Sequence, residues 1–213
     1  MAISLVAGAT GLVGSHVLKQ LALVEERPIA LLRRTPNDLP DNVKAIEVDF
    51  DELLASGDLP QCDHLYLCLG TTIKTAGSQA AFRNVDFNYC LGIAQMAASS
   101  GTSVISLVSS VGADANSKNF YLRTKGQLEE AIKLLNFSSI NIYRPGLLIG
   151  DRQEKRSAEK VGQLLSKVID PFLIRGLSRY RSIKATLLAN TMIDNGNKGK
   201  GVNYFHFKNF NTW

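Results

Sequence analysis

Three glycines, each three residues after the last, lie near the start of the chain and constrain its fold more than any other feature. Gly8, Gly11 and Gly14 follow an apolar run at residues 3–7, and apolar residues then recur at helical spacing as far as Leu21. This order predicts a buried strand, a tight turn and a helix. The turn is predicted to hold a dinucleotide pyrophosphate, because small residues let the backbone approach and a helix N-terminus offers free N–H groups. The G-x-x-G-x-x-G spacing is a variant of the usual fingerprint, and an ordinary Gly-rich turn is the alternative.

Elsewhere the chain alternates between short apolar runs and longer segments of helical periodicity. We expect strands at residues 2–7, 28–33, 44–48, 63–69, 103–109, 139–143 and 202–207, and helices at 12–24, 79–99, 118–136, 157–168 and 184–195, with a weak turn near 51–55. Strands joined by crossover helices imply an α/β fold with a doubly wound parallel sheet. At 213 residues, 45% of them hydrophobic, the chain can bury one substantial core, so we expect residues 1–213 to form a single domain.

Polar or Gly-rich residues follow six of the expected strands. Ligand sites in open parallel sheets lie beyond the carboxyl ends of the strands, which all meet at one edge. In chain order these residues are Gly8, Arg33, Asp49, Gly70-Thr71-Thr72, Ser109-Ser110 and Arg144-Pro145-Gly146. Their joint placement predicts one ligand site at this edge.

Tyr121 and Lys125 stand four residues apart in the expected helix 118–136, eleven residues after the Ser109-Ser110 pair. Helical spacing of four puts the phenol and the ammonium on one face, one turn apart. An ammonium close to a phenol favours the phenolate and lowers the pKa of a tyrosine from its reference of about 10. This pairing makes the tyrosine a usable proton donor or acceptor near neutral pH. By itself the spacing also describes two solvated surface residues.

The second expected strand is followed directly by Arg33 and Arg34. NAD sites usually place a carboxylate here for the ribose 2′-OH, whereas NADP sites place arginine against the 2′-phosphate. No carboxylate ends this strand, and guanidinium groups suit bidentate recognition of phosphate. The sequence therefore predicts NADP (NADPH) as the cofactor in preference to NAD, unless the two arginines only begin a solvated loop.

With these residues assembled, the chain resembles the short-chain dehydrogenase/reductase superfamily, whose core is a Rossmann fold. It is most similar to the atypical epimerase-like branch and to its small Tat-interacting-protein-type oxidoreductases. The resemblance covers about residues 2–195 and rests on six motifs: Gly8-x-x-Gly11-x-x-Gly14, Val48-Asp49, Cys68-Leu69-Gly70-Thr71-Thr72, Val108-Ser109-Ser110-x-Gly112-Ala113-Asp114, Tyr121-x-x-x-Lys125-Gly126 and Tyr143-Arg144-Pro145-Gly146-Leu147-Leu148-Ile149-Gly150.

The resemblance implies a role for each matching residue. Tyr121 would exchange a proton with the substrate oxygen, Lys125 would lower its pKa and bind the nicotinamide ribose, and Ser110 would hydrogen-bond the substrate oxygen, with Ser109 as the alternative. Asp49 would meet the adenine amino group, and Pro145-Gly146 would shape the nicotinamide pocket. The full implied set of cofactor-binding residues is Gly8, Thr10, Gly11, Leu12, Val13, Gly14, Arg33, Arg34, Asp49, Leu69, Gly70, Thr71, Thr72, Tyr121, Lys125, Arg144, Pro145 and Gly146.

The chain also departs from the superfamily pattern. Members often have Asn in the helix after the fourth strand, supporting a proton relay, whereas this chain places Asp86 there between Asn84 and Asn88. The chain is short, so residues 151–195 must form most of a small substrate cap. A small cap favours a compact substrate over a nucleotide sugar.

Composition and cysteine usage predict the setting in which the protein works. The net charge of +5 is modest and its basic residues are scattered, so no nucleic-acid partner is expected. No apolar stretch reaches the roughly 18–20 residues of a membrane span. Cys62, Cys68 and Cys90 lack metal-ligand spacing, which predicts no metal site and suggests buried, reduced thiols in a cytoplasmic protein.

The leading hypothesis is an NADP(H)-dependent oxidoreductase that acts on a small carbonyl or alcohol substrate through Ser110, Tyr121 and Lys125. Two alternatives stay open: an NADP(H)-binding regulatory or redox-sensing protein with little turnover, and a sugar-nucleotide epimerase or dehydratase. We expect a monomer or a homodimer.

Overall fold

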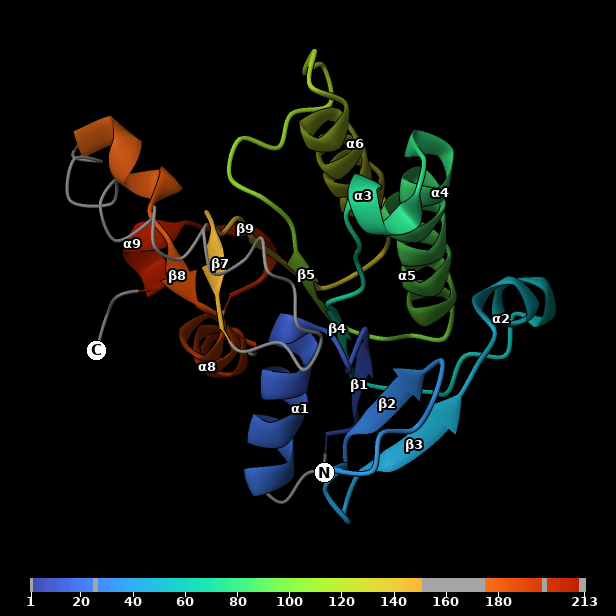
Figure 1. Cartoon of the computed structure of the whole chain (residues 1–213). Coiled ribbons are helices and arrows are strands. Elements are labelled where there is room, and N and C mark those ends of the chain that lie inside the picture. Colours follow the sequence, from blue (N-terminus) through green and yellow to red (C-terminus); the bar gives the residue numbers. More distant parts are fainter. Residues whose placement is uncertain (1, 25–26, 151–174, 197–198, 211–213) are drawn as a thin grey trace.

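The computed structural model describes residues 2–24, 27–150, 175–196 and 199–210 and has an α/β architecture (Figure 1). Within these residues a seven-stranded sheet has the order β3-β2-β1-β4-β5-β6-β9, and every neighbouring pair is parallel. Its strands are β1 Ser4–Ala7, β2 Ile29–Leu32, β3 Lys44–Glu47, β4 His64–Leu67, β5 Val104–Val108, β6 Ser139–Tyr143 and β9 Gly201–Phe205. The predicted doubly wound parallel sheet is confirmed.

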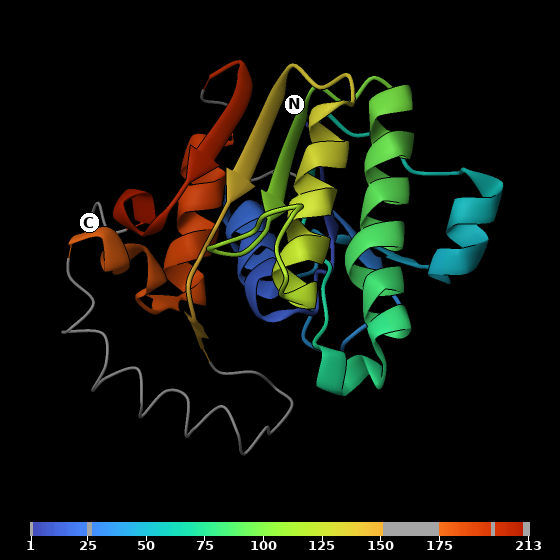
Figure 2. The ribbon, with the colours of Figure 1, turned by 90° about the horizontal axis from the view of Figure 1, so that it is seen from above.

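Helices cover both faces of this sheet (Figure 2). The described helices are α1 Leu12–Leu23, α2 Phe50–Ser56, α3 Ile73–Ala76, α4 Gln79–Arg83, the π-helix η1 Asn84–Tyr89, α5 Cys90–Ser99, α6 Phe120–Lys133, the 3₁₀ helix η3 Arg175–Tyr180, α8 Ala185–Asn195 and α9 Phe207–Phe210. Among the described residues no helix has the length and apolar character that crossing a membrane requires.

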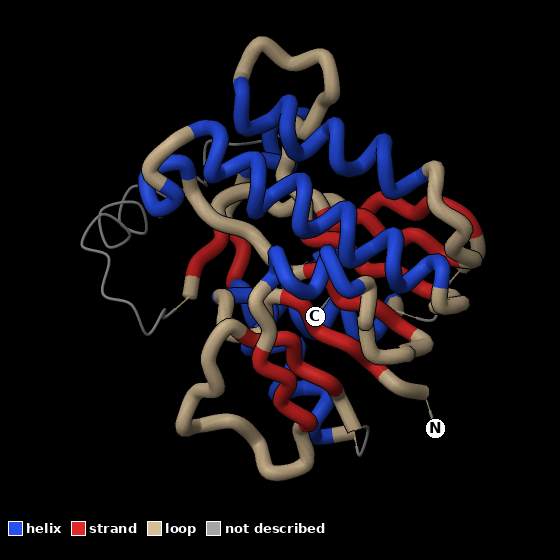
Figure 3. The backbone as a smooth tube through the Cα atoms, turned by 90° about the vertical axis from the view of Figure 1, so that its right-hand side faces the viewer, coloured by secondary structure: helices blue, strands red, loops and turns tan. Residues whose placement is uncertain are grey.

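The two faces of the sheet carry separate hydrophobic cores, because side chains alternate along each strand. Leu5 packs with α5 and α6 through Ile93 and Leu128, whereas its neighbour Val6 packs with α1 and α8 through Val17 and Leu188. Figure 3 shows the long helices of one layer running alongside the strands. The sheet is therefore held from both sides, and its carboxyl edge is fixed as a platform for the loops that follow each strand.

Most expected elements agree with the structure to within one to three residues at each end. The weak turn near 51–55 is a helix, α2, because the Asp49 carboxylate accepts hydrogen bonds from the N–H groups of its first turn. The expected helix 79–99 is interrupted by the π-helical segment η1, which the hydrophobic period did not predict. The short elements α3, η3, α9 and a two-stranded sheet of β7 Leu148–Ile149 and β8 Ile183–Lys184 were also not expected.

The expected cap at 151–195 divides into two parts. Residues 151–174, with the expected helix 157–168, lie outside the described residues. Helix α8, by contrast, buries Leu188, Ala189 and Met192 in the core that α1 forms on one face of the sheet. Residues 185–195 therefore belong to the main body, and a cap formed by the earlier residues remains a prediction.

Candidate functional site

The glycine turn lies against the end of β4. Gly8 has φ +83°, and a Cβ there would lie 2.6 Å from the carbonyl carbon of Cys68. A Cβ on Gly14 would lie 2.2 Å from the Gly8 carbonyl oxygen, so neither position accommodates a larger residue. Gly11 caps helix α1, and no side chain accepts the first-turn N–H groups of that helix. The predicted pyrophosphate turn therefore has the required small residues and open helix N-terminus.

Within this turn the predicted contact residues differ in exposure. Thr10 and Gly11 are exposed, whereas Leu12 is half-buried and Val13 is buried in the core. A ligand at this helix end would meet Val13 through its backbone.

The end of β2 presents Arg33 and Arg34 to solvent, which fits both the predicted phosphate contact and the alternative of a solvated loop. A carboxylate that the sequence reading overlooked lies beside them. Glu47, at the end of β3, pairs in register with Leu32 and accepts a 2.8 Å hydrogen bond from Thr35 N–H. This hydrogen bonding with Thr35 lowers the pKa of Glu47. The carboxylate comes from the neighbouring strand, which is why the residues following β2 gave no indication of it.

Asp49, predicted to meet adenine, follows β3 and is exposed. Its Oδ1 accepts hydrogen bonds from Asp51 N–H at 2.8 Å and from Glu52 N–H at 3.2 Å. This is N-capping of α2. The structure gives Asp49 a local role that the sequence reading did not include, and an adenine contact remains a prediction.

Helix α6 places Tyr121 and Lys125 on one face, as predicted. The helix begins where Asn119 caps it through Leu122 N–H, at 3.1 Å. Its closest approach to the chain after β5 is at Gly126, where a Cβ would lie 2.2 Å from the Asp114 carbonyl carbon. Glycine at this position therefore lets α6 dock against the loop that carries the serine pair.

Lys125 is buried and forms an ion pair with Asp86, with Nζ and Oδ1 2.8 Å apart. Burial is the largest single influence and alone would lower the pKa of the lysine. The charge of Asp86, together with smaller contributions from Tyr121, Cys90 and the hydrogen bond to Asp86, outweighs it, so that the pKa is raised. The lysine therefore stays protonated throughout the neutral range. Tyr121 is half-buried, with its ring centroid 5.6 Å from that of Phe82.

The loop after β4 lies against this ion pair. Thr71 N–H donates a 2.7 Å hydrogen bond to Asp86 Oδ2. A Cβ on Gly70 would lie 3.2 Å from Asp86 Oδ1 and 3.7 Å from Lys125 Nζ. The predicted residues Gly70 and Thr71 are thus next to Lys125. Thr72 lies further out and caps α3.

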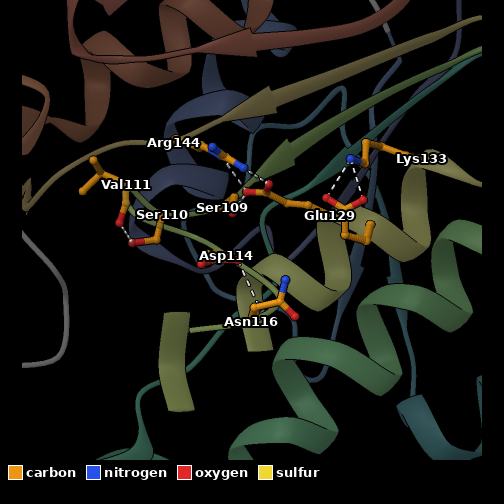
Figure 4. Close-up of polar contacts among 9 residues, drawn as sticks. Ser109, Ser110, Val111, Asp114, Asn116, Glu129, Lys133 and Arg144 are labelled. Atoms are coloured by element: carbon orange, nitrogen blue, oxygen red, sulfur yellow. Dashed lines mark hydrogen bonds and ion pairs between the residues drawn. The ribbon is translucent and has the colours of Figure 1, made fainter. Parts of the chain in front are cut away.

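The two serines after β5 have different partners (Figure 4). Ser109 is buried and its hydroxyl donates to Glu129 Oε1, whereas Ser110 is half-buried and its hydroxyl donates a longer, 3.3 Å hydrogen bond to the Val111 carbonyl oxygen. A committed hydroxyl cannot also serve a substrate. This difference supports Ser110 over Ser109 as the serine that would face a substrate.

Arg144, predicted to contact the cofactor, is held elsewhere. Its guanidinium forms two hydrogen bonds with the Glu129 carboxylate, the Nε bond being 3.0 Å long (Figure 4). The guanidinium also lies 4.7 Å from the centroid of the Tyr204 ring. Arg144 therefore joins the end of β6 to α6, and a contact of its side chain with a cofactor remains a prediction.

Pro145 and Gly146 connect the end of β6 to two other loops. The Pro145 carbonyl accepts a 2.8 Å hydrogen bond from Val111 N–H, next to Ser110. A Cβ on Gly146 would lie 2.4 Å from the Arg181 carbonyl oxygen, so glycine lets the segment after η3 pack closely. The predicted pocket wall thus borders the Ser110 loop.

Two of these contacts were not predicted from sequence. Glu129 stands four residues after Lys125, so the i, i+4, i+8 spacing from Tyr121 would have placed it on the same face. The sequence showed Asp86 as a departure from the superfamily pattern but did not predict that it pairs with Lys125. A sequence pattern does not indicate which charges meet across helices.

The three cysteines have free thiols and pack within the hydrophobic cores. Burial raises the pKa of Cys68 and of Cys90 to about 12. Across the described part of the chain no three metal-ligating side chains gather at one point.

Comparison with known proteins gives a family and several relatives. The model of the NAD dependent epimerase/dehydratase family matches residues 4–206. Protein FMP52, mitochondrial, of Candida albicans is 33% identical over 204 residues, covering 90% of this chain and 86% of the relative. Protein fmp52, mitochondrial, of Emericella nidulans is 36% identical over 168 residues (75% and 72%), and Protein HTATIP2 of Rattus norvegicus is 33% identical over 149 residues (70% and 60%).

Among solved structures, the Thermus thermophilus UDP-glucose 4-epimerase complex with NAD has a TM-score of 0.72 and 14% identity, covering 96% of this chain and 77% of that one. The Bordetella bronchiseptica enzyme WbmH in complex with NAD+ has a TM-score of 0.71 and 15% identity, covering 97% and 75%. At such identities these likenesses show the fold alone.

These names correct one expectation. The fungal relatives are named as mitochondrial proteins, which contradicts the prediction of a cytoplasmic protein. That prediction rested on cysteine usage, which distinguishes reducing from oxidising surroundings and does not identify an organelle.

Proposed function

The chain belongs to the NAD dependent epimerase/dehydratase family, and on this premise we propose that it is an NADP(H)-dependent oxidoreductase of a small carbonyl or alcohol. One observation carries the proposal. Tyr121 and the protonated Lys125 lie on one face of α6, with Lys125 beside the Gly70 loop. A phenol near a fixed ammonium, at the carboxyl edge of a parallel sheet, is suited to exchanging a proton with a ligand bound there.

The residues around the glycine turn fit a dinucleotide. Gly8 and Gly14 leave no room for side chains, and the N-terminus of α1 is open toward an anion. Arg33 and Arg34 are exposed at the end of β2, where they support a 2′-phosphate and hence NADP(H). When bound, the cofactor supplies or accepts a hydride.

The chain's own groups would handle the substrate oxygen. Tyr121 would give it a proton, or take one in the reverse direction, and the Ser110 hydroxyl would donate a hydrogen bond to it. Both are needed because a carbonyl oxygen becomes an oxyanion during reduction, and donors aimed at that charge stabilise the transition state. Lys125 would hold the ribose hydroxyls while keeping its charge near Tyr121.

The test is binding followed by a substrate screen. Titration calorimetry should show NADPH binding, and a panel of small aldehydes and ketones should include compounds that consume NADPH, measured by its absorbance. A chain that binds neither NADPH nor NADH would contradict the proposal. Tightly copurifying NAD with conversion of a sugar nucleotide would replace it by the epimerase alternative.

A further inference from the structure

Asp86 is a buried charge placed by an irregular piece of helix. It lies in the π-helix η1, and its side chain is 1% exposed. One carboxylate oxygen pairs with Lys125 Nζ at 2.8 Å, and the other accepts Thr71 N–H at 2.7 Å. π-Helical turns are rare and occur frequently at functional sites. This one directs a carboxylate to the point where α6 meets the loop after β4.

The other charged groups on α6 and α4 have partners other than Lys125 and Asp86. Glu129, one turn beyond Lys125, is paired with Arg144. Arg83, at the end of α4, donates a 2.7 Å hydrogen bond to Gln127 Oε1 and lies over the Phe87 ring at 4.2 Å.

The α5 group that interacts with the pair is the thiol of Cys90. Burial raises the pKa of Cys90 to about 12, so this thiol is neutral at neutral pH. Among the described residues around Lys125, the carboxylate of Asp86 is therefore the charge that balances the ammonium.

Building on the proposed function, we propose that Asp86 is a positioning residue that fixes the Lys125 ammonium beside the Gly70–Thr71 loop and offsets its field at Tyr121. An unpaired ammonium would favour the phenolate. A paired one has a weaker field and so a weaker preference for the phenolate. The protonated hydroxyl is the form that carbonyl reduction requires, because the substrate oxygen must gain a proton.

The reaction that this arrangement favours is balanced. Tyr121 would give its O–H proton to the substrate oxygen, which would receive the carbonyl π pair as the C–H bond forms. Bound NADPH would supply the hydride for that C–H bond and would leave as NADP+. The phenolate then regains a proton from solvent.

The test removes the charge of Asp86 while keeping its shape. Asp86→Asn retains an oxygen to accept Thr71 N–H. Glu130→Gln is the matched control, because Glu130 lies on α6, the helix of Lys125, and pairs on the surface with Lys133. The rate of alcohol oxidation with NADP+, plotted against pH, should fall off in an acidic limb. In Asp86→Asn this limb should lie about one pH unit lower than in the wild type. In Glu130→Gln it should stay in place. An unmoved limb, or one moved to higher pH, would overturn the proposal.

A second readout does not need turnover. The absorbance of the phenolate, isolated by subtracting spectra of Tyr121→Phe, gives the titration midpoint of Tyr121 directly. This midpoint should fall in Asp86→Asn. If the midpoint falls but no variant reduces any carbonyl, the proposed function fails while the role of Asp86 holds; a fixed midpoint in an active enzyme overturns only the role of Asp86.

A third comparison covers the case in which Asp86→Asn does not fold. The midpoint of Tyr121 in Lys125→Met should be higher than in the double variant Lys125→Met/Asp86→Asn, since only the first retains the carboxylate. Equal midpoints would overturn the proposal.

Discussion

Helix α6 carries two buried ion pairs one turn apart, and they hold different parts of the molecule. Lys125 pairs with Asp86, and the pair meets the loop that follows β4. Glu129 pairs with Arg144, and that carboxylate also accepts the Ser109 hydroxyl (Figure 4). The first pair places a charge beside a phenol, whereas the second ties the ends of β5 and β6 to the helix.

The difference shows that one helix face can carry both a pair that holds the fold together and a pair that serves the site. The hydrogen bonds of the Glu129 carboxylate go to Arg144, at the end of β6, and to Ser109, just after β5. Through Ser109 they also fix the start of the loop that carries Ser110. The Lys125 pair leaves the ammonium close to groups that a ligand would touch. We therefore expect damage to the Glu129 pair to appear mainly as lost stability, and damage to the Lys125 pair mainly as lost activity.

The largest stability effect is expected from breaking the second pair. Glu129→Ala leaves Arg144 and Ser109 without their partner, and removing one member of a buried pair costs about 3–5 kcal/mol. Urea unfolding should show this loss, with Glu130→Gln as the control at roughly 0–1 kcal/mol. A loss as small as the control's would mean that the Glu129 pair does not hold the strand ends.

Replacing both members of each pair would sharpen the comparison. Neutral, well-packed replacements of a buried pair are often close to neutral for stability. Lys125→Met/Asp86→Asn should therefore fold with a small change in unfolding free energy but lose NADPH turnover by about 10²-fold or more. Glu129→Gln/Arg144→Met should fold similarly and lose less turnover than the first double variant. Equal losses of turnover in the two double variants would show that the pairs do not differ in role.

The sequence predicted much of this site because strand ends follow from hydrophobic runs. Gly8, Gly70 and Ser110 follow β1, β4 and β5 and lie at the carboxyl edge for that reason, whereas Tyr121 was predicted from helical spacing with Lys125. It could not predict the pairing of Asp86, since this depends on a π-helical turn that changes which residues of 79–99 face α6.

Other contacts were hidden because they join residues distant in sequence. Glu47 approaches Thr35 across two strands, and Arg144 meets Glu129 from β6. The strands β7 and β8 are two residues each, too short for any periodicity to show.

Cofactor choice should give the next largest effect. Arg33→Asp removes a charge-assisted contact to a 2′-phosphate, worth roughly 1.5–3 kcal/mol. Titration calorimetry should show tighter binding of NADPH than NADH in the wild type and a flattened or reversed preference in the variant. Equal dissociation constants in the wild type would remove Arg33 from this role.

Another buried ionisable group, His64, differs from the two ion pairs because its partner is uncharged. It is hydrogen-bonded to Ser106 at 2.9 Å and stacked on Tyr66, and burial lowers its pKa from 6.5 to about 3. The unfolded chain binds a proton here below pH 6.5, whereas the folded chain does not until about pH 3. Its stability contribution is therefore full above pH 6.5 and declines as pH falls, by about 1.4 kcal/mol per unit.

The pH dependence of unfolding in urea measures this contribution. His64→Gln should have a shallower decline in unfolding free energy than the wild type across the window from pH 6.5 to about 3. Parallel declines in the two proteins would show that His64 is not the group responsible.

The central claim is that the Tyr121 hydroxyl exchanges a proton with the substrate while the rest of the site binds the cofactor. Tyr121→Phe removes only that hydroxyl. The decisive measurement is NADPH-dependent turnover of this variant on a carbonyl that the wild type reduces, alongside its NADPH dissociation constant. We predict a dissociation constant close to that of the wild type and turnover lower by about 10²–10⁴-fold. Turnover equal to that of the wild type would contradict the account.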